Sequence, residues 1–218
     1  MPITLEFADN PDPRCACVLL LDNSGSMIGD PIDALNAGLR SFQVDLQDDH
    51  LARRRVELAI VTFGGTVEMP QDFVTAGNFT APVLYASGET PMGSAINKGL
   101  DLIAERKSIY KQNGIVYYRP WVFMITDGAP TDGNVWRDSA KRVRQEMAEK
   151  KLEFFAVGVR NADMQVLSEI TPRALKLEGL KFNELFIWLS QSQRRASAST
   201  PGVQVEMPKV SFGSPINS

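Results

Sequence analysis

The chain has 218 residues, of which 44% are hydrophobic and 22% are charged, a balance typical of one globular domain with a substantial core. Its 23 basic residues are outnumbered by 26 acidic ones, so the composition gives no sign of the basic surface that nucleic-acid-binding proteins need. The first ten residues lack a basic start and a long hydrophobic run, and they predict neither a signal peptide nor a membrane span. We therefore expect a cytoplasmic protein without nucleic-acid or membrane partners.

The first predicted element is a buried strand, the hydrophobic run from Cys15 to Leu21. It contains the only two cysteines, Cys15 and Cys17, whose side chains point to the same face at this spacing on a strand. We interpret them as two buried thiols. A zinc site would need further Cys or His ligands nearby, and the only histidine is His50.

Amphipathic helices alternate with strands along the rest of the chain. The helices show hydrophobic residues at three- to four-residue spacing, and two of them begin with a capping residue followed by proline, Asp30-Pro31 and Thr90-Pro91. The further predicted strands cover residues 56–63, 66–69, 121–125, 152–159 and 175–177. The predicted helices cover residues 31–47, 92–107, 136–147, 163–170 and 182–189, and an irregular, exposed connection covers residues 71–89.

This alternation predicts an α/β fold with a doubly wound, mostly parallel central sheet and helices on both of its faces. The continuous hydrophobic run at 121–125 is typical of a central parallel strand that is covered on both sides. The strand at 66–69 follows a Gly64-Gly65 turn and is predicted to be one antiparallel edge strand. In such a sheet, ligands bind at the carboxyl ends of the strands.

Oxygen-bearing side chains occur in three loops that leave a predicted strand or enter a predicted helix. Asp22, Ser24 and Ser26 follow the first strand at alternate positions, Thr90 precedes a helix, and Asp127 follows a central strand. These loops can converge on one point, where five such side chains would suit a hard divalent cation. Taken singly, each residue also has an ordinary structural interpretation as a helix cap, a turn residue or a strand end.

The D-x-S-x-S pattern with a later Thr and a later Asp resembles the metal-ion-dependent adhesion site (MIDAS) of the von Willebrand factor A (VWA) family. The resemblance implies that Ser24, Ser26 and Thr90 are direct hydroxyl ligands, while Asp22 and Asp127 act largely through bound water. It also implies an open coordination position, which a carboxylate of a protein partner fills. The oxygen ligands favour Mg²⁺, with Ca²⁺ and Mn²⁺ as alternatives.

Longer stretches are similar to a particular VWA subfamily, the bacterial tellurite-resistance proteins of the TerY type. The similar residues are 88–93, 118–132, 188–190 and 201–202, and Ala129 departs from the acidic residue expected at its position. That subfamily is associated with stress-response gene clusters that also encode a protein kinase and a PP2C-type phosphatase. The resemblance thus implies an intracellular adaptor in a phosphorylation circuit.

Enzyme classes find less support in the residues. A Ser-His-Asp hydrolase needs a positioned base, but His50 lies at a predicted helix end where we expect it to be solvated. Neither a G-x-S-x-G elbow nor a P-loop occurs, and Ser24 stands where a haloacid-dehalogenase phosphatase would carry a second Asp. We therefore expect a binding module rather than an enzyme. The alternatives are a VWA subunit of an ATPase-driven, chelatase-like complex and, behind it, a metal-dependent hydrolase.

The expected domain covers residues 13–190 and lies between an N-terminal segment, 1–12, and a tail, 191–218. The tail contains Ser, Pro and Gly and few large hydrophobic residues, so we expect it to be flexible. Three hydroxyl residues that follow the basic pair Arg194-Arg195 are candidates for phosphorylation, namely Ser197, Ser199 and Thr200. An unmodified, solvated tail is the alternative.

Overall fold

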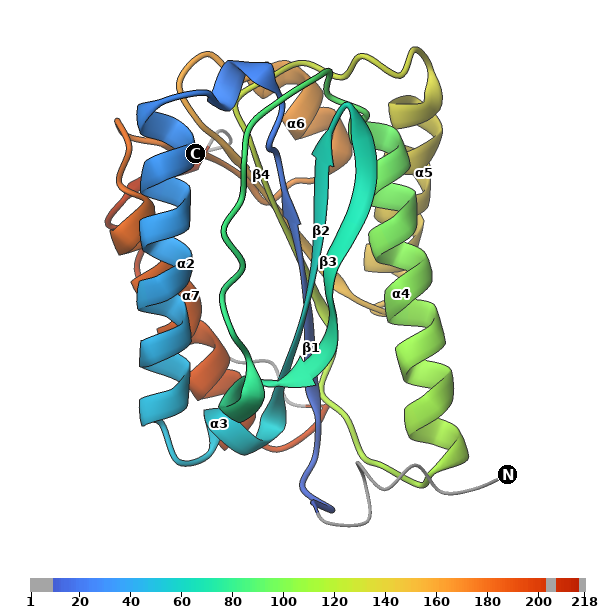
Figure 1. Ribbon diagram of the computed structural model, residues 1–218. Helices are drawn as coiled ribbons and strands as arrows, with labels where there is room; N and C mark the ends of the chain where they lie inside the picture. The colour runs from blue at the N-terminus through green and yellow to red at the C-terminus, as the bar shows by residue number, and fades with distance from the viewer. Residues whose placement is uncertain (1–9, 203–206, 216–218) are drawn as a thin grey trace.

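The computed structural model describes residues 10–202 and 207–215 and places a seven-stranded sheet between two layers of helices (Figure 1). The strands are β1 (Cys15–Leu21), β2 (Val56–Gly64), β3 (Thr66–Thr75), β4 (Trp121–Thr126), β5 (Glu153–Gly158), β6 (Ala174–Leu177) and β7 (Gly213–Pro215). The helices are α2 (Asp30–Asp48), α3 (Ala52–Arg55), α4 (Met92–Gln112), α5 (Val135–Ala148), α6 (Met164–Ile170) and α7 (Phe182–Ala198), with single turns η1 (Gly25–Met27) and η2 (Ala76–Asn78). Each predicted strand and helix is present, although several ends differ.

The strand order is β3-β2-β1-β4-β5-β6-β7, and the five inner strands are parallel. The doubly wound, mostly parallel fold is therefore confirmed, as is the antiparallel edge strand β3. A second antiparallel strand, β7, pairs with β6 at the other edge and was not predicted. No helix in the described ranges is long and hydrophobic enough to cross a membrane.

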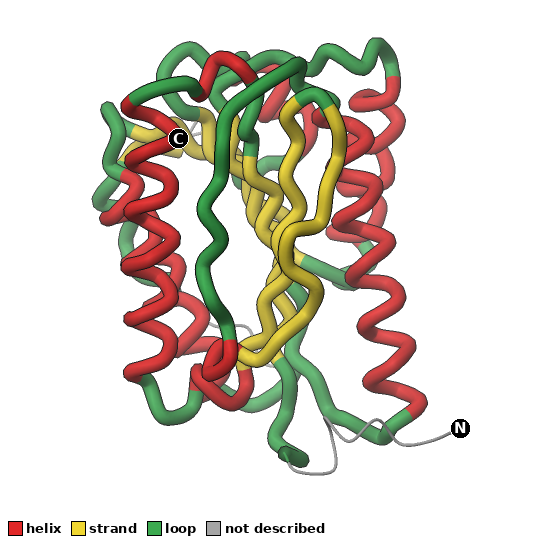
Figure 2. The backbone as a smooth tube through the Cα atoms, in the orientation of Figure 1, coloured by secondary structure: helices red, strands yellow, loops and turns green. Residues whose placement is uncertain are grey.

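The central strands are hydrophobic along their whole length because both faces of the sheet are covered. Every residue of β1 is buried. Its odd-numbered residues pack in a core cluster with α2 and α7, and its even-numbered residues pack in a second cluster with α4, α5 and α6. Figure 2 shows these helical layers on either side of the strands. Polar side chains are thus excluded from the sheet faces and concentrate at the strand ends.

Helix α7 departs from the predicted domain organisation. It continues to Ala198, past the expected domain end at residue 190, and Ser192 and Gln193 within the extension are buried. Ser192 donates to the Trp188 carbonyl, and Gln193 Oε1 accepts a hydrogen bond from the Cys15 thiol at 3.1 Å, whereas Gln193 Nε2 has no hydrogen-bond partner among the described residues. The expectation of a flexible tail therefore does not hold for residues 191–198, whose small polar side chains fit a buried helix face.

The start of α2 also differs from the prediction. Gly29 occupies the cap position with a φ of 85°, a conformation that favours glycine, and Asp30 is the first helical residue without a capping side-chain hydrogen bond. Asp30 and Asp33 instead place negative charge in the first helical turn, where it interacts favourably with the positive end of the helix dipole.

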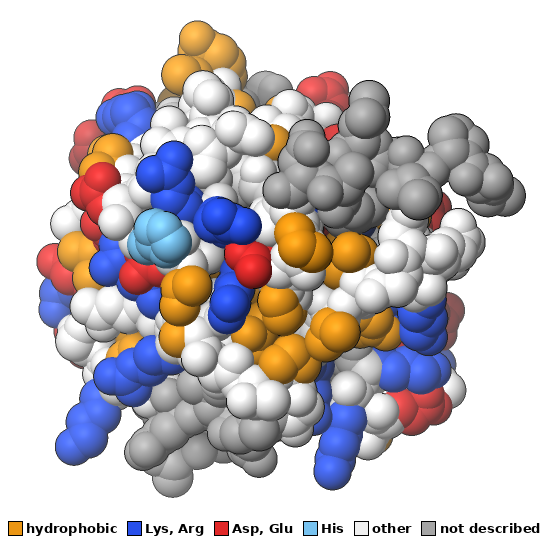
Figure 3. Space-filling view, turned by 90° about the horizontal axis from the view of Figure 1, so that it is seen from below, with side chains coloured by type: hydrophobic (Ala, Val, Ile, Leu, Met, Phe, Trp, Pro, Cys, Tyr) orange, Lys and Arg blue, Asp and Glu red, His pale blue; other side chains and the backbone are white. Residues whose placement is uncertain are grey.

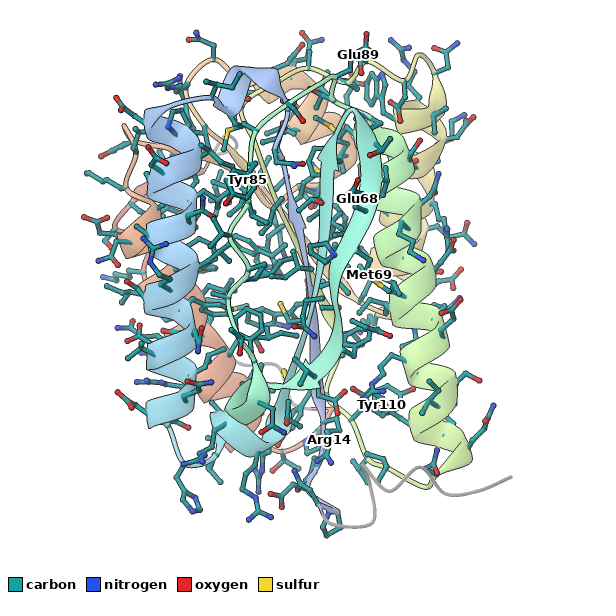
Figure 4. All side chains as sticks on the ribbon, viewed as in Figure 1. Arg14, Glu68, Met69, Tyr85, Glu89 and Tyr110 are labelled. Carbon is teal, nitrogen blue, oxygen red and sulfur yellow. The ribbon has the colours of Figure 1, made fainter. Side chains whose placement is uncertain are left out.

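A buried ionic cluster lies at the amino-terminal end of β1 and β2 (Figure 4). The Glu57 carboxylate accepts hydrogen bonds from Arg14 Nε at 2.9 Å, from Arg106 Nε at 2.7 Å and from the Tyr110 hydroxyl. The surface at this end, seen in Figure 3, carries a band of hydrophobic side chains bordered by Lys and Arg. The cluster joins the residues before β1 to β2 and α4. It lies at the end of the sheet opposite the predicted site.

We expect Glu57→Gln to lower the free energy of unfolding by about 3–5 kcal/mol, because two buried guanidinium groups lose the ion pair with the Glu57 carboxylate. Urea denaturation at neutral pH measures this change. The matched control is Glu153→Gln, whose arginine partners are partly exposed, and its cost is expected to stay below about 1 kcal/mol. Equal costs for the two variants would show that the buried cluster does not stabilise the fold as described.

Both cysteines are free and buried, as predicted. Burial, followed by the nearby Glu57 charge, raises the pKa of the Cys15 thiol from 9.0 to about 12, and burial raises the pKa of Cys17 as well. The folded protein therefore keeps both thiols protonated at pH 9, where unfolded thiols begin to ionise, so stability falls as the pH rises above 9.0.

We expect no reaction with a thiol reagent at pH 8 in the native protein and two reactive thiols after denaturation. Rapid native labelling would contradict the buried state.

Candidate metal centre

Three loops meet at the carboxyl edge of the parallel strands, at the top of Figure 1. Hydrogen bonds between backbone groups tie them together. The Asp22 N–H donates to the Ile125 carbonyl at 2.9 Å, and the Gly25 N–H donates to the Gly88 carbonyl at 2.9 Å. The loop after β1 is thereby held against both the end of β4 and the segment that leads into α4.

Asp22 is buried directly after β1, and both of its carboxylate oxygens accept hydrogen bonds. The Ser24 N–H donates to Oδ1 at 2.8 Å, and the Thr126 hydroxyl donates to Oδ2. Burial raises the pKa of Asp22 and the Asp127 charge adds to the rise, while the hydrogen bonds from Ser24 and Thr126 oppose it. In the part of the chain that the structure describes, no Lys or Arg forms an ion pair with this carboxylate, so a bound cation would compensate its charge.

The two serines of the loop connect Asp22 to the end of β4. The Ser24 and Ser26 hydroxyl oxygens lie 3.0 Å apart, and the Ser26 hydroxyl donates to Asp127 Oδ1 at 2.6 Å. Ser24 and Asp127 are buried, whereas Ser26 is exposed at the surface. The loop therefore presents a short row of oxygens that reaches from the buried carboxylate to the solvent.

Thr90 does not cap the helix that follows it. Pro91 occupies the cap position of α4, and the backbone of Thr90 is instead held by Thr131. The Thr90 N–H donates to the Thr131 hydroxyl at 3.0 Å, and the Thr131 N–H donates to the Thr90 carbonyl at 3.0 Å. Among the described residues, the Thr90 hydroxyl has no hydrogen-bond partner. The alternative interpretation of Thr90 as a simple helix cap is therefore not supported.

Gly128 shows that the Thr90 hydroxyl and the Asp22 carboxylate line the same small space. A Cβ atom at Gly128 would lie 3.2 Å from Thr90 Oγ1 and 3.8 Å from Asp22 Oδ2. The absence of a side chain at this position keeps the space open beside hydroxyl and carboxylate oxygens, the ligands that hard divalent cations prefer.

The five predicted site residues thus reach one edge of the sheet, although their role as metal ligands stays a prediction. Within residues 10–202 and 207–215, no group of three or more His, Cys, Asp or Glu side chains is placed to hold a metal, and this includes the candidate site. A site at this edge must therefore use hydroxyl oxygens. Three hydroxyls with two carboxylates fit a hard cation such as Mg²⁺.

Sequence reasoning missed three residues that support this arrangement. Thr126 donates to Asp22, Thr131 holds the backbone of Thr90, and Asp132 accepts hydrogen bonds from the Ser94 N–H at 2.8 Å and hydroxyl at 3.1 Å. Asp132 thereby satisfies a backbone N–H in the first turn of α4 from another loop. Thr126 carried a usable signal, since it is a polar residue that ends a hydrophobic strand next to Asp127.

The tail residues proposed for phosphorylation differ in accessibility. Ser197 is buried in α7 and its hydroxyl donates to the Arg194 carbonyl at 3.0 Å, so a kinase would reach it only if the end of α7 opened, and its phosphorylation stays a prediction. Ser199 is half-buried and donates to the Ala196 carbonyl, while Thr200 is exposed. Phosphorylation of Ser199 or Thr200 stays a prediction.

The fold and the position of the loops define a VWA-type domain. The family model of the von Willebrand factor type A domain matches residues 17–183, and the chain therefore belongs to this family. A search of curated proteins finds no match.

Solved structures with the same fold are distant in sequence. The pilus adhesin SpaC from Lactobacillus rhamnosus GG superposes with a TM-score of 0.67 at 15% identity, over 84% of this chain and 30% of SpaC. Proximal thread matrix protein 1 from the mussel byssus gives 0.60 at 12% identity, over 90% of this chain and 50% of that protein. Manganese-loaded TRAP from Plasmodium vivax gives 0.55 at 15% identity, over 81% and 73% of the two chains. This chain thus spans half or less of the first two proteins, and the likeness concerns the fold.

We expect Gly128→Ala to weaken divalent-metal binding at least about tenfold, because the added methyl group enters the space beside Thr90 and Asp22. Calorimetric titration with Mg²⁺ measures the affinity, and thermal unfolding in EDTA checks that the fold is retained. Gly133→Ala is a poor control because its φ is positive, so Ala129→Gly in the same loop serves instead. Unchanged affinity in Gly128→Ala would place the metal elsewhere.

Proposed function

We propose that this protein is a metal-ion-dependent protein-interaction module with a MIDAS-type site, and that it is not an enzyme. The observation that carries the proposal is the meeting of Asp22, Ser24, Ser26, Thr90 and Asp127 at one edge of the sheet. Ser24, Ser26 and Thr90 would hold the cation directly, and the two carboxylates would act largely through water. Because the direct ligands would be neutral hydroxyls and the two carboxylates would act through water, a carboxylate of a protein partner could fill the remaining coordination position.

The related structures support this proposal. Proximal thread matrix protein 1 is described with a zinc-occupied MIDAS motif, TRAP is described as manganese-loaded, and SpaC is a pilus adhesin. We propose Mg²⁺ as the ion in this protein, with Ca²⁺ or Mn²⁺ as alternatives, because small hydroxyl ligands suit its compact shell. A Ser-His-Asp hydrolase would need its histidine near the site, but His50 is exposed in the turn after α2, at the opposite end of that helix.

We further propose that the protein is a cytoplasmic adaptor of the TerY type in a bacterial tellurite-resistance or stress-response circuit. Its partners would then be a protein kinase and a PP2C-type phosphatase. The support is the similarity of residues 88–93 and 118–132, which surround Thr90 and Asp127. A VWA subunit of an ATPase-driven, chelatase-like complex is the second candidate, because the same metal site would serve either assembly.

The double variant Asp22→Ala with Ser24→Ala is expected to abolish the calorimetric signal of Mg²⁺ binding while circular dichroism stays unchanged. The physical reason is the loss of the buried carboxylate and of one direct hydroxyl ligand. The matched control is Asp101→Ala with Ser108→Ala, which removes the same two groups from exposed positions of α4 that are more than two helical turns from Thr90. Full Mg²⁺ binding by a folded Asp22/Ser24 variant would falsify the site assignment.

A pull-down from the native host, with and without EDTA, tests the class of partner and the metal dependence of the contact in one experiment. Metal-dependent recovery of a kinase and a phosphatase supports the adaptor, and recovery of a ring ATPase supports the second candidate. Recovery of the kinase and the phosphatase that is unchanged by EDTA would contradict a metal-dependent contact with them.

A further inference from the structure

A surface beside the candidate metal centre combines exposed hydrophobic and acidic side chains. It is formed by β3 and by residues 79–91, an extended segment that runs along the sheet between α2 and β3 (Figures 1 and 2). We call it the β3–segment surface, and it comprises Glu68, Gln71, Asp72, Val83, Tyr85 and Glu89.

Helix α2 fixes the backbone of the 79–91 segment through its amide side chains. Asn36 donates to the Leu84 carbonyl at 2.9 Å and accepts from the Leu84 N–H at 2.8 Å. Gln43 accepts from the Ala81 N–H at 2.8 Å. Leu84 points inward and is 5% exposed, so its neighbours Val83 and Tyr85 point outward and are 60% and 79% exposed. Two large hydrophobic side chains are thus held in solvent on a backbone that is already ordered.

The register of β3 places acidic and polar side chains on the same side of the sheet. Glu68 is paired with Thr62, and Gln71 is paired with Ile60. Paired residues of antiparallel strands share a face of the sheet. Ile60 packs in the core cluster that includes Leu84, so Glu68 and Gln71 lie on the face of the sheet that the 79–91 segment covers. Figure 4 shows Glu68, Tyr85 and Glu89 along this face. The Gly65 N–H donates to the Glu89 carbonyl at 2.7 Å, which joins the two parts of the surface at their upper end.

The charge of this surface has one sign. No Lys, Arg or His occurs between residues 56 and 97, whereas Glu68, Asp72 and Glu89 are exposed. Among the described residues these three carboxylates form no ion pair. Helix α2 carries exposed side chains of both signs, including Asp33 and Arg40. The surface therefore complements a basic partner, and its hydrophobic side chains supply contact area.

We propose that the β3–segment surface binds an extended segment of a protein partner that contains both basic and hydrophobic residues. Tyr85 is the central contact, because its backbone is fixed by hydrogen bonds and a large aromatic side chain is typical of binding hot spots. The surface adjoins the metal loop, since Asn23 donates to the Tyr85 carbonyl at 2.9 Å. None of its six side chains belongs to the candidate metal ligands, so the proposal goes beyond the metal-dependent contact and can be tested in EDTA.

The probe is a fluorescently labelled short peptide that alternates Lys or Arg with Val or Leu, and its binding is followed by anisotropy in EDTA at low salt. We expect Tyr85→Ala combined with Val83→Ser to weaken binding at least about tenfold. Val44→Ser on α2, which is 55% exposed and lies outside the surface, is the matched hydrophobic control and should change the affinity less than about twofold.

The charge requirement has its own matched pair of triple variants. Glu68→Gln, Asp72→Asn and Glu89→Gln together should weaken binding about tenfold and reduce its salt dependence. Asp48→Asn, Glu105→Gln and Glu169→Gln remove the same charge from exposed positions elsewhere and should leave the affinity within about twofold. Equal losses in both triple variants, or equal binding of a peptide with Glu in place of the basic residues, would overturn the proposal.

The outcome is separable from that of the proposed function. The Asp22→Ala, Ser24→Ala variant is expected to bind this peptide with the affinity of the unchanged chain, since the peptide contact uses no metal. Loss of peptide binding in this folded variant would show that the contact lies at the metal loop and would overturn the assignment to the β3–segment surface.

Discussion

The two hydrogen bonds that Asp22 accepts are the constraint on which the candidate site depends. One comes from the backbone of its own loop and the other from Thr126 at the end of β4, so a single buried carboxylate joins neighbouring strands where both end. A carboxylate buried without a basic partner is costly. The fold accepts this cost at the sheet edge, where a cation can approach from solvent and compensate the charge.

The covering of both sheet faces determines where polar chemistry can occur. β1 and β4 are buried along their whole length, so charged groups are restricted to the ends of the strands. At the amino end, Glu57 is neutralised by two arginines within the chain. At the carboxyl end, Asp22 has no such partner among the described residues. The contrast separates a group that stabilises the fold from a group that is available to a ligand.

The fold, and the meeting of the five candidate residues at one edge of the sheet, could be predicted because they depend on local patterns. Continuous hydrophobic runs mark covered strands, and D-x-S-x-S with later Thr and Asp marks one sheet edge. The missed features depend on long-range pairing. Thr131 and Asn36 act through the backbones of Thr90 and Leu84, which lie far away in sequence. The extension of α7 was missed because small polar residues are expected to be exposed to solvent, and the sequence does not show which surface buries them.

The candidate metal position and the proposed β3–segment surface would differ in the charge that they attract. A cation held mainly by hydroxyls attracts a carboxylate, whereas Glu68, Asp72 and Glu89 attract basic groups and repel acidic ones. A uniformly acidic partner would therefore be attracted to the metal and repelled by the acidic surface beside it. A segment with an acidic residue next to basic and hydrophobic residues would gain at both places, and the opposite preferences of two adjoining contacts would fix the direction in which it binds.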